Sequence, residues 1–308
     1  MRRTILSAAV LLCCAVLGAQ TTSEQFKARH QRQVKNVGAS GVGVENIIDR
    51  WEEAFPDDPD MLEARFSYYA SKSCKVEVVR KDAERFLGNK PLMSIPDSTG
   101  KNVNFFQESF YDDSLFALGL KAIDRAIAVS PDNIGYRLEK ITALLSYEKE
   151  SPDLAGEELL SLIDYETSSH PEWNLWGAEV KEDDFVGMVQ EYCWMFFHTG
   201  TPNSMETFKT VSERMNKLYP SNTTFIANLG SYWLVGQKNT KKALKCYNKV
   251  LKLDPSDYTA AKNCVLAART ERNLKLEKKY LPQLIANCTD EAEKASCEAR
   301  LAVISGMK

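Results

Sequence analysis

A pair of helical segments ending in proline repeats near the C-terminus, and this repeat constrains the fold more than any other feature. Leu218-Tyr219-Pro220 closes one segment, and Leu253-Asp254-Pro255 closes another 35 residues later. A helix–turn–helix unit of about 34 residues cannot bury its apolar faces alone, so it must stack on neighbouring units. We therefore expect a row of stacked helix pairs.

Apolar residues also recur at spacings of three and four outside this unit, which predicts further helices. We expect them at about 44–55, 61–69, 115–127, 136–145, 154–163, 183–198, 203–218, 257–271, 274–286 and 290–304. The last of these carries a charged face suited to a terminal cap of a helical array. Residues 20–42 are polar, and we expect a flexible leader there, with one frayed helix as the alternative. The repeat domain then spans residues 43–308.

Residues 74–112 interrupt the helical pattern and predict a β-hairpin insertion. Val76, Val78 and Val79 are β-branched, and the apolar runs 90–95 and 103–106 flank the turn sequence Pro96-Asp97-Ser98-Thr99-Gly100. Two short apolar runs separated by turn residues are typical of a hairpin. Inserts in repeat proteins tend to lie on one face, so this hairpin either covers a neighbouring helix pair or forms a recognition arm.

The unit from Pro220 to Pro255 resembles the tetratricopeptide repeat (TPR) family. Leu229-Gly230, Trp233, Gly236, Ala243 and Tyr247 match the family's pattern of small and large residues, although the turn 236–240 is one residue longer. Residues 110–131 look like the closing helix of a second unit. The chain also resembles exported bacterial TPR proteins of uncharacterised role. The resemblance implies an all-α solenoid whose concave groove binds a protein or peptide, and it does not imply an enzyme.

The first residues have the pattern of a secretory signal peptide. Arg2 and Arg3 precede an apolar run over residues 5–17, which is too short to cross a bilayer and ends in Gly18-Ala19. We expect cleavage after Ala19, so that the mature protein is periplasmic or extracellular. Its net charge then changes from −3 to −5, and no later run of apolar residues is long enough to cross a membrane.

Six cysteines remain after cleavage, and an even count in an exported protein permits disulfides. Two pairings fit the predicted helix spacing. Cys288 and Cys297 lie at the end of one helix and within the next, and Cys246 and Cys264 lie on helices that should pack together. The alternative is that all six are small apolar side chains at helix contacts.

The sequence contains no credible catalytic set, and we expect neither a metal nor another cofactor. The three histidines lack neighbours suited to bind a metal, and no Gly-x-Ser-x-Gly motif is present. The net charge of −3 gives no indication of nucleic-acid binding. The expected function is therefore that of a non-catalytic scaffold in the bacterial cell envelope. Among the first helices of the pairs, the register should turn Ser231, Lys262 and Arg269 toward a bound protein or peptide.

Tryptophans around the link at 170–181 suggest an alternative. Trp173 and Trp176 lie in this irregular link, and Trp194 follows in the next helix among other aromatic residues. Large aromatic residues at helical spacing usually fill a core. If some are exposed, they could form a platform for a peptide or for a sugar ring. The second hypothesis is therefore an envelope accessory protein that binds a glycan or small ligand through these tryptophans.

Overall fold

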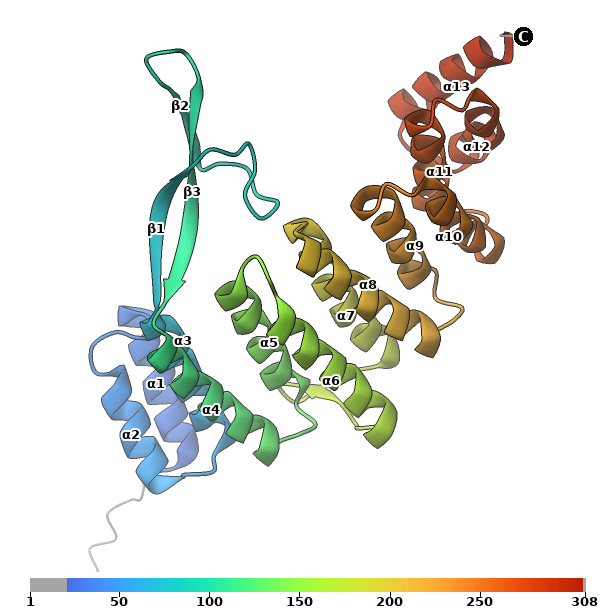
Figure 1. Cartoon of the computed structure of the whole chain (residues 1–308). Helices are drawn as coiled ribbons and strands as arrows, with labels where there is room; N and C mark the ends of the chain where they lie inside the picture. Colours follow the sequence, from blue (N-terminus) through green and yellow to red (C-terminus); the bar gives the residue numbers. More distant parts are fainter. Residues whose placement is uncertain (1–20, 307–308) are drawn as a thin grey trace, which may run out of the picture.

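The computed structural model describes residues 21–306, in which helices follow one another in a curved row (Figure 1). The predicted signal peptide, residues 1–19, lies outside the described residues. Consecutive helices pair as α1 with α2, α3 with α4, and so on to α11 with α12. Their bounds are α1 Ser23–Val37, α2 Val44–Ala54, α3 Pro59–Ser73, α4 Asp113–Val129, α5 Ile134–Glu148, α6 Asp153–Ser169, α7 Glu182–Thr199, α8 Pro202–Leu218, α9 Thr223–Ser231, α10 Thr240–Leu253, α11 Tyr258–Thr270, α12 Leu274–Asn287 and α13 Glu291–Gly306.

This architecture confirms the predicted all-α, TPR-like solenoid. Every helix range predicted from apolar spacing overlaps one of these helices. The buried apolar side chains form three clusters in succession along the row, rather than one central core. That arrangement is expected when each helix pair contacts mainly its neighbours. The row ends at α13, which packs on α12 at the predicted capping position.

Asparagine and aspartate side chains fix where most helices begin. The residue before each of seven helices accepts a hydrogen bond from a backbone N–H in the first turn, which stabilises a helix by about 1 kcal/mol. These residues are Asp58, Asp112, Asn133, Asn222, Asn239, Asp257 and Asn273. The caps sharpen the turns, so that successive helices fold back on one another.

The contact between α9 and α10 shows why the family pattern requires glycine. A Cβ atom built on Gly230 would lie 2.5 Å from the Tyr247 ring, closer than two non-bonded carbon atoms can approach. After Ser231 the helix widens into a π-helical turn, Tyr232–Gly236. This wider turn accommodates the additional residue noted in the sequence between α9 and α10.

The prediction of a flexible leader over residues 20–42 is wrong in part, because α1 forms an ordered helix within this range. Thr22 and Gln25 form a capping box at the start of α1. The buried Phe26 ring stacks on Trp51 of α2, with ring centroids 6.3 Å apart. Polar contacts supply much of the remaining attachment, including Lys27 Nζ to Asp60 Oδ2 at 2.7 Å. A helix with one buried apolar residue has too little apolar periodicity to be found from its sequence.

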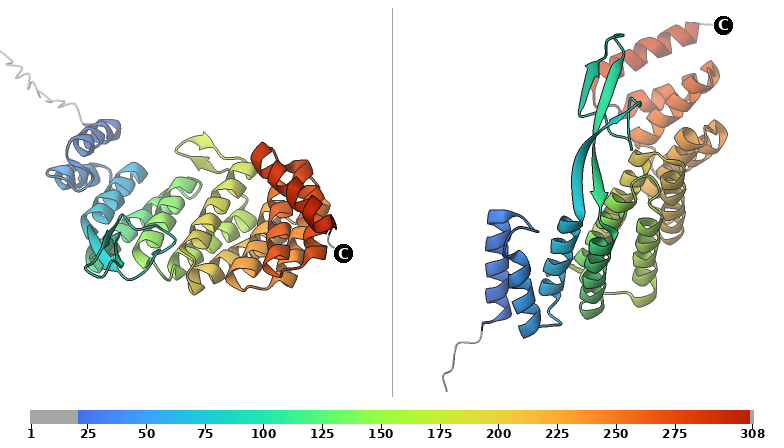
Figure 2. Two further views of the ribbon diagram at one scale, coloured as in Figure 1. Left: turned by 90° about the horizontal axis from the view of Figure 1, so that it is seen from above. Right: turned by 60° about the vertical axis from the view of Figure 1, so that its left-hand side comes forward.

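The insertion forms a three-stranded β-arm between α3 and α4, the two helices of one pair. Its strands are β1 Cys74–Lys81, β2 Met93–Pro96 and β3 Asn102–Tyr111, in the order β1-β3-β2. The predicted hairpin near residues 90–106 is confirmed by the β2–β3 pairing, in which Met93 lies opposite Phe105. Sequence spacing did not show that β1 pairs with β3 along its whole length, with Cys74 opposite Tyr111. Figure 2 shows that the arm and the C-terminal helices rise from the row on the same side.

Candidate binding groove

The first helices of successive pairs, α3, α5 and α7, line two adjoining hollows. The hollow between α3 and α5 has a volume of about 500 Å³, and we call it the acidic hollow because Glu63 and Glu139 face it. Its apolar wall contains Phe66, Phe116 and Trp176. The second, the arm hollow, has a volume of about 510 Å³ and lies between the β-arm and the C-terminal ends of α5 and α7. Ser146 borders both hollows, which therefore adjoin there, and we call the two together the groove.

A short hairpin in the link between α6 and α7 places Trp176 beside the acidic hollow. Its strands are β4 Asn174–Leu175 and β5 Ala178–Glu179. The hairpin turns back toward the start of α5, where the Asn133 side-chain oxygen accepts hydrogen bonds from the backbone N–H groups of Gly135 and Trp176. A Cβ atom on Gly135 would lie 2.5 Å from the Trp176 ring, so glycine is needed there. Trp176 remains 49% exposed.

The carboxyl groups of Glu63 and Glu139 are unpaired. Within residues 21–306 neither side chain forms a hydrogen bond or an ion pair, and the Oε2 atom of Glu139 is shielded from solvent without any partner. Burial and the nearby Asp60 carboxylate raise the pKa of Glu63 to about 7. Burial and the charge of Glu63 raise the pKa of Glu139 to about 8. The hollow therefore holds two carboxyl groups whose ionisation requires more free energy than it does in water.

The charges around these carboxyls come from several helices. Lys27 of α1 attracts Glu63, but its Nζ is bonded to Asp60 Oδ2 at 2.7 Å. Tyr136 of α5 and Tyr192 of α7 lie near Glu139, and burial together with the carboxylates raises the pKa of both phenols. Both phenols stay neutral when the carboxyls ionise. No cation among these groups is left to neutralise Glu139.

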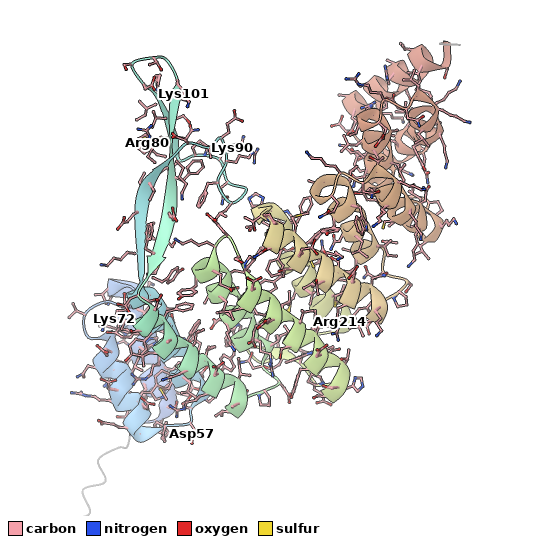
Figure 3. The ribbon with its side chains drawn as sticks, in the orientation of Figure 1. Asp57, Lys72, Arg80, Lys90, Lys101 and Arg214 are labelled. Carbon is pink, nitrogen blue, oxygen red and sulfur yellow. The ribbon has the colours of Figure 1, made fainter. Side chains whose placement is uncertain are left out.

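Ion pairs hold the β-arm against the helices at the arm hollow. Glu108 of β3 is 12% exposed, and its two carboxylate oxygens lie 2.9 Å from Lys81 Nζ and 3.0 Å from Lys149 Nζ. Lys81 is on β1 and Lys149 follows α5, so one carboxylate joins the arm to the solenoid. Loop residues 82–92 also reach α7, where a Cβ atom on Gly88 would overlap the backbone oxygen of His198. Lys90 lies on this loop, which bends from the arm toward the helices (Figure 3).

Trp194 supplies an exposed aromatic surface in the arm hollow. Its ring is 55% exposed and stacks on His198, with centroids 4.8 Å apart and 14° between the planes. Polar side chains of Asn89 and Gln107 line the same hollow, together with the apolar Phe86. The arm hollow can thus offer a stacking face with polar groups around it.

The structure separates the tryptophans that the sequence grouped together. Trp173 is a core residue, 5% exposed, and its Nε1 donates to Glu166 Oε2 at 2.6 Å. Trp176 and Trp194 lie in different hollows of the groove. Of the two tryptophans proposed for partner binding from the link, only Trp176 is therefore accessible to a partner.

The three other predicted contact residues lie in the C-terminal units and line neither hollow. Ser231 Oγ lies 3.2 Å from the Tyr247 hydroxyl. Lys262 pairs with Glu293 of α13 at 3.1 Å, and Arg269 pairs with Glu277 of α12 at 2.7 Å. Both cations thus hold the last helices together. Their predicted role in partner binding stays a prediction.

Glu63 and Glu139 were missed by the sequence reading. Each has apolar residues within two positions on both sides, in Met61-Leu62-Glu63-Ala64 and in Leu138-Glu139-Lys140-Ile141. A carboxyl group on the apolar side of a helix is the one signal that could have marked them. Nothing in the spacing indicates that the two face the same hollow, because the β-arm and α4 intervene in the chain.

The six cysteines of the described residues are free thiols. Cys288 and Cys297 are both buried, and Cys288 Sγ donates to the Asp290 backbone oxygen at 3.3 Å. The disulfide between Cys288 and Cys297 is absent from the structure and stays a prediction for the oxidised protein. Within the described part of the chain, no group of three or more acidic, histidine or cysteine side chains is arranged to hold a metal ion. None of the helices over residues 21–306 is both long and apolar enough to span a bilayer.

Comparison with known proteins yields no family model and no curated protein that matches the sequence. Solved structures that align over most of the chain include PilW, a type IV pilus biogenesis factor. The two sequences are 9% identical, the alignment covers 90% of this chain and 99% of PilW, and the TM-score is 0.38. PilF of Pseudomonas aeruginosa has 12% identity, coverages of 92% and 84%, and a TM-score of 0.26. The flexible tandem repeat domain of a bacterial cellulose synthase component has 14% identity, coverages of 94% and 99%, and a TM-score of 0.27. These TM-scores are too low to carry an argument, so the solenoid assignment rests on the helix pairs themselves.

Proposed function

We propose that the protein is a non-catalytic scaffold of the bacterial cell envelope that binds an extended segment of a protein partner in the groove of α3, α5 and α7. The observation that carries this proposal is that the two hollows adjoin along the first helices of successive pairs. The two hollows meet at Ser146, and each exposes about half of a tryptophan side chain. A row of side-chain-sized hollows between parallel helices fits an extended peptide. The envelope location rests on the predicted signal peptide.

Binding to pools of random decapeptides tests this function. The mature protein, immobilised, should retain a subset of the peptides, and Trp176→Ala with Trp194→Ala should lower their retention at least about tenfold. The matched control removes exposed apolar side chains outside the groove, Leu253→Ala with Val303→Ala, and should retain peptides as the wild type does. Equal loss in both double variants, or no retained peptide at all, would contradict the proposal.

A glycan is the second candidate ligand, and the exposure of Trp194 is the observation that favours it. Trp194 shares the arm hollow with the amide side chains of Asn89 and Gln107, and an exposed aromatic face with amides in the same hollow suits a sugar ring as well as a peptide side chain. Quenching of tryptophan fluorescence by envelope oligosaccharides, measured on the wild type and on Trp194→Ala, separates the two. Saturable quenching that disappears in the variant would favour the glycan.

A further inference from the structure

We propose that the acidic hollow is a specificity site for a lysine or arginine side chain of the bound peptide. The cationic group would lie between Glu63 and Glu139, and the aliphatic part of the side chain would lie against Trp176. This inference rests on the proposed peptide-binding function and names the kind of residue that the groove selects.

Shape and chemistry of the hollow both suit a long cationic side chain. A volume of about 500 Å³ accommodates such a side chain together with part of the peptide backbone. Trp176 presents an exposed ring at the hollow, and aromatic rings attract both alkyl chains and cations. The two carboxyls come from different helices, α3 and α5, so a cation that contacts both would also connect two helix pairs.

The unmet bonding capacity of Glu139 is the second, independent observation. Its Oε2 atom is hidden from solvent and accepts no hydrogen bond from a described residue. A buried acceptor without a partner costs about 1–3 kcal/mol, and more when it is charged. An entering guanidinium or ammonium group, bonded to the carboxyls that line the hollow, would compensate the charge of Glu139 and remove the repulsion between the two carboxylates. A neutral or acidic side chain would leave the Glu139 carboxylate without a compensating charge, and the repulsion between the two carboxylates would remain.

Two other shielded carboxylates of the molecule do not offer this chemistry. In the arm hollow, Glu108 is already neutralised by Lys81 and Lys149. Near the C-terminus, Glu277 is neutralised by Arg269 and Arg300. Glu63 and Glu139 therefore differ from these carboxylates in being open to a cation supplied from outside.

The test uses decapeptide pools that differ at one central position, which is lysine, arginine, norleucine or glutamate. Norleucine matches the length of lysine without its charge. We expect the wild type to retain the lysine and arginine pools at least about tenfold more strongly than the norleucine pool, and the glutamate pool least. Glu63→Gln with Glu139→Gln should abolish this preference while retention of the norleucine pool persists. The control, Glu53→Gln with Glu298→Gln, removes the same net charge from exposed positions, and it should still prefer the lysine and arginine pools.

The pH dependence gives a second readout. The cation favours ionised carboxylates, whose pKa values in the free protein are about 7 and about 8. Retention of the arginine pool should therefore rise from pH 6 to pH 9, since arginine stays charged throughout. Lys27 and Asp60 lie near Glu63, and Tyr136 and Tyr192 lie near Glu139. The pKa values of Lys27 and of both phenols are raised, so these three groups keep their charge states over this range.

The outcomes separate the two proposals. If no pool is retained, peptide binding itself is refuted. If the pools are retained equally, or if the Glu53→Gln, Glu298→Gln control loses the preference as fully as the hollow variant does, peptide binding stands and the cation site is refuted. Equal inhibition by free N-acetyl-lysine amide and by the lysine pool would show a site for free amines instead, and would also overturn the inference as stated.

Discussion

Buried carboxylates have opposite surroundings in the last helices and in the acidic hollow. Glu277 of α12 is 1% exposed and accepts hydrogen bonds from Arg269 Nε at 2.7 Å and from Arg300 at 2.8 and 3.0 Å. Arg269 is on α11 and Arg300 on α13, so one carboxylate joins three helices. Glu63 and Glu139 have no such partners among residues 21–306. The comparison distinguishes a charge that holds the fold together from charges that have no partner among the described residues.

The two environments also respond to pH in opposite directions. The hydrogen bonds from Arg300 lower the pKa of Glu277, despite burial, so its contribution to stability is lost as the pH falls through that value. Burial raises the pKa of Glu63 and Glu139 above the unfolded value. The folded state therefore holds their protons more tightly, and these two groups reduce stability as the pH rises from about 4.5 to about 8.

Replacement of Glu277 should give the largest effect on stability. Glu277→Ala leaves Arg269 and Arg300 without their shared partner and opens a small void, so we expect a loss of about 3 kcal/mol in unfolding free energy. Amide hydrogen exchange should quicken in α11, α12 and α13 first, because the loss is local in a repeat array. Glu298→Ala, which removes an exposed carboxylate of α13, should change stability by less than about 0.5 kcal/mol. Equal effects of the two substitutions would show that the Glu277 ion pairs do not hold these helices.

Neutralising the acidic hollow should stabilise the protein, and only at high pH. At pH 9 we expect Glu63→Gln with Glu139→Gln to raise the free energy of unfolding by about 2 kcal/mol. This value is smaller than the pKa shifts alone would give, because both side chains keep some contact with solvent. Near pH 4.5 the wild-type carboxyls are protonated in the folded state, so the difference should vanish. Urea titrations at the two pH values measure it. A variant less stable than the wild type at pH 9 would mean that the carboxyls have partners after all.

Loosening the β-arm should give the smallest effect. Glu108→Gln removes the charge that attracts Lys81 and Lys149, and we expect a loss of about 1 kcal/mol. The change should be seen as faster hydrogen exchange in loop residues 82–92, with α11–α13 unaffected. Glu84→Gln alters an exposed carboxylate of the same loop and serves as control. If exchange in the loop is the same in Glu108→Gln and in the control, the arm is held by its apolar contacts alone.

Local patterns predicted the helices well and the site poorly. Apolar spacing, proline positions and turn residues reflect interactions within one turn or one helix pair, and they sufficed to find α2–α13 and the β2–β3 hairpin. They failed for α1, whose attachment relies on Phe26 and on polar contacts to distant residues. They also predicted Lys262 and Arg269 as groove contacts, which stays a prediction. The local pattern did not reveal that α12 and α13 supply acidic partners for both cations.

The sequence by itself therefore determined a stack of helix pairs with an inserted hairpin, since each of these features follows from interactions between residues close in the chain. Only the tertiary structure decided which side chains meet across the groove. Glu63 and Glu139 are brought to one hollow because α5 packs on α4, the partner of α3, with the whole arm and α4 between them in the chain. Trp176 reaches the same place because the Asn133 side-chain oxygen accepts a hydrogen bond from its backbone N–H, and because Gly135 leaves room for its ring. Such juxtapositions depend on packing between distant segments, which no local pattern encodes.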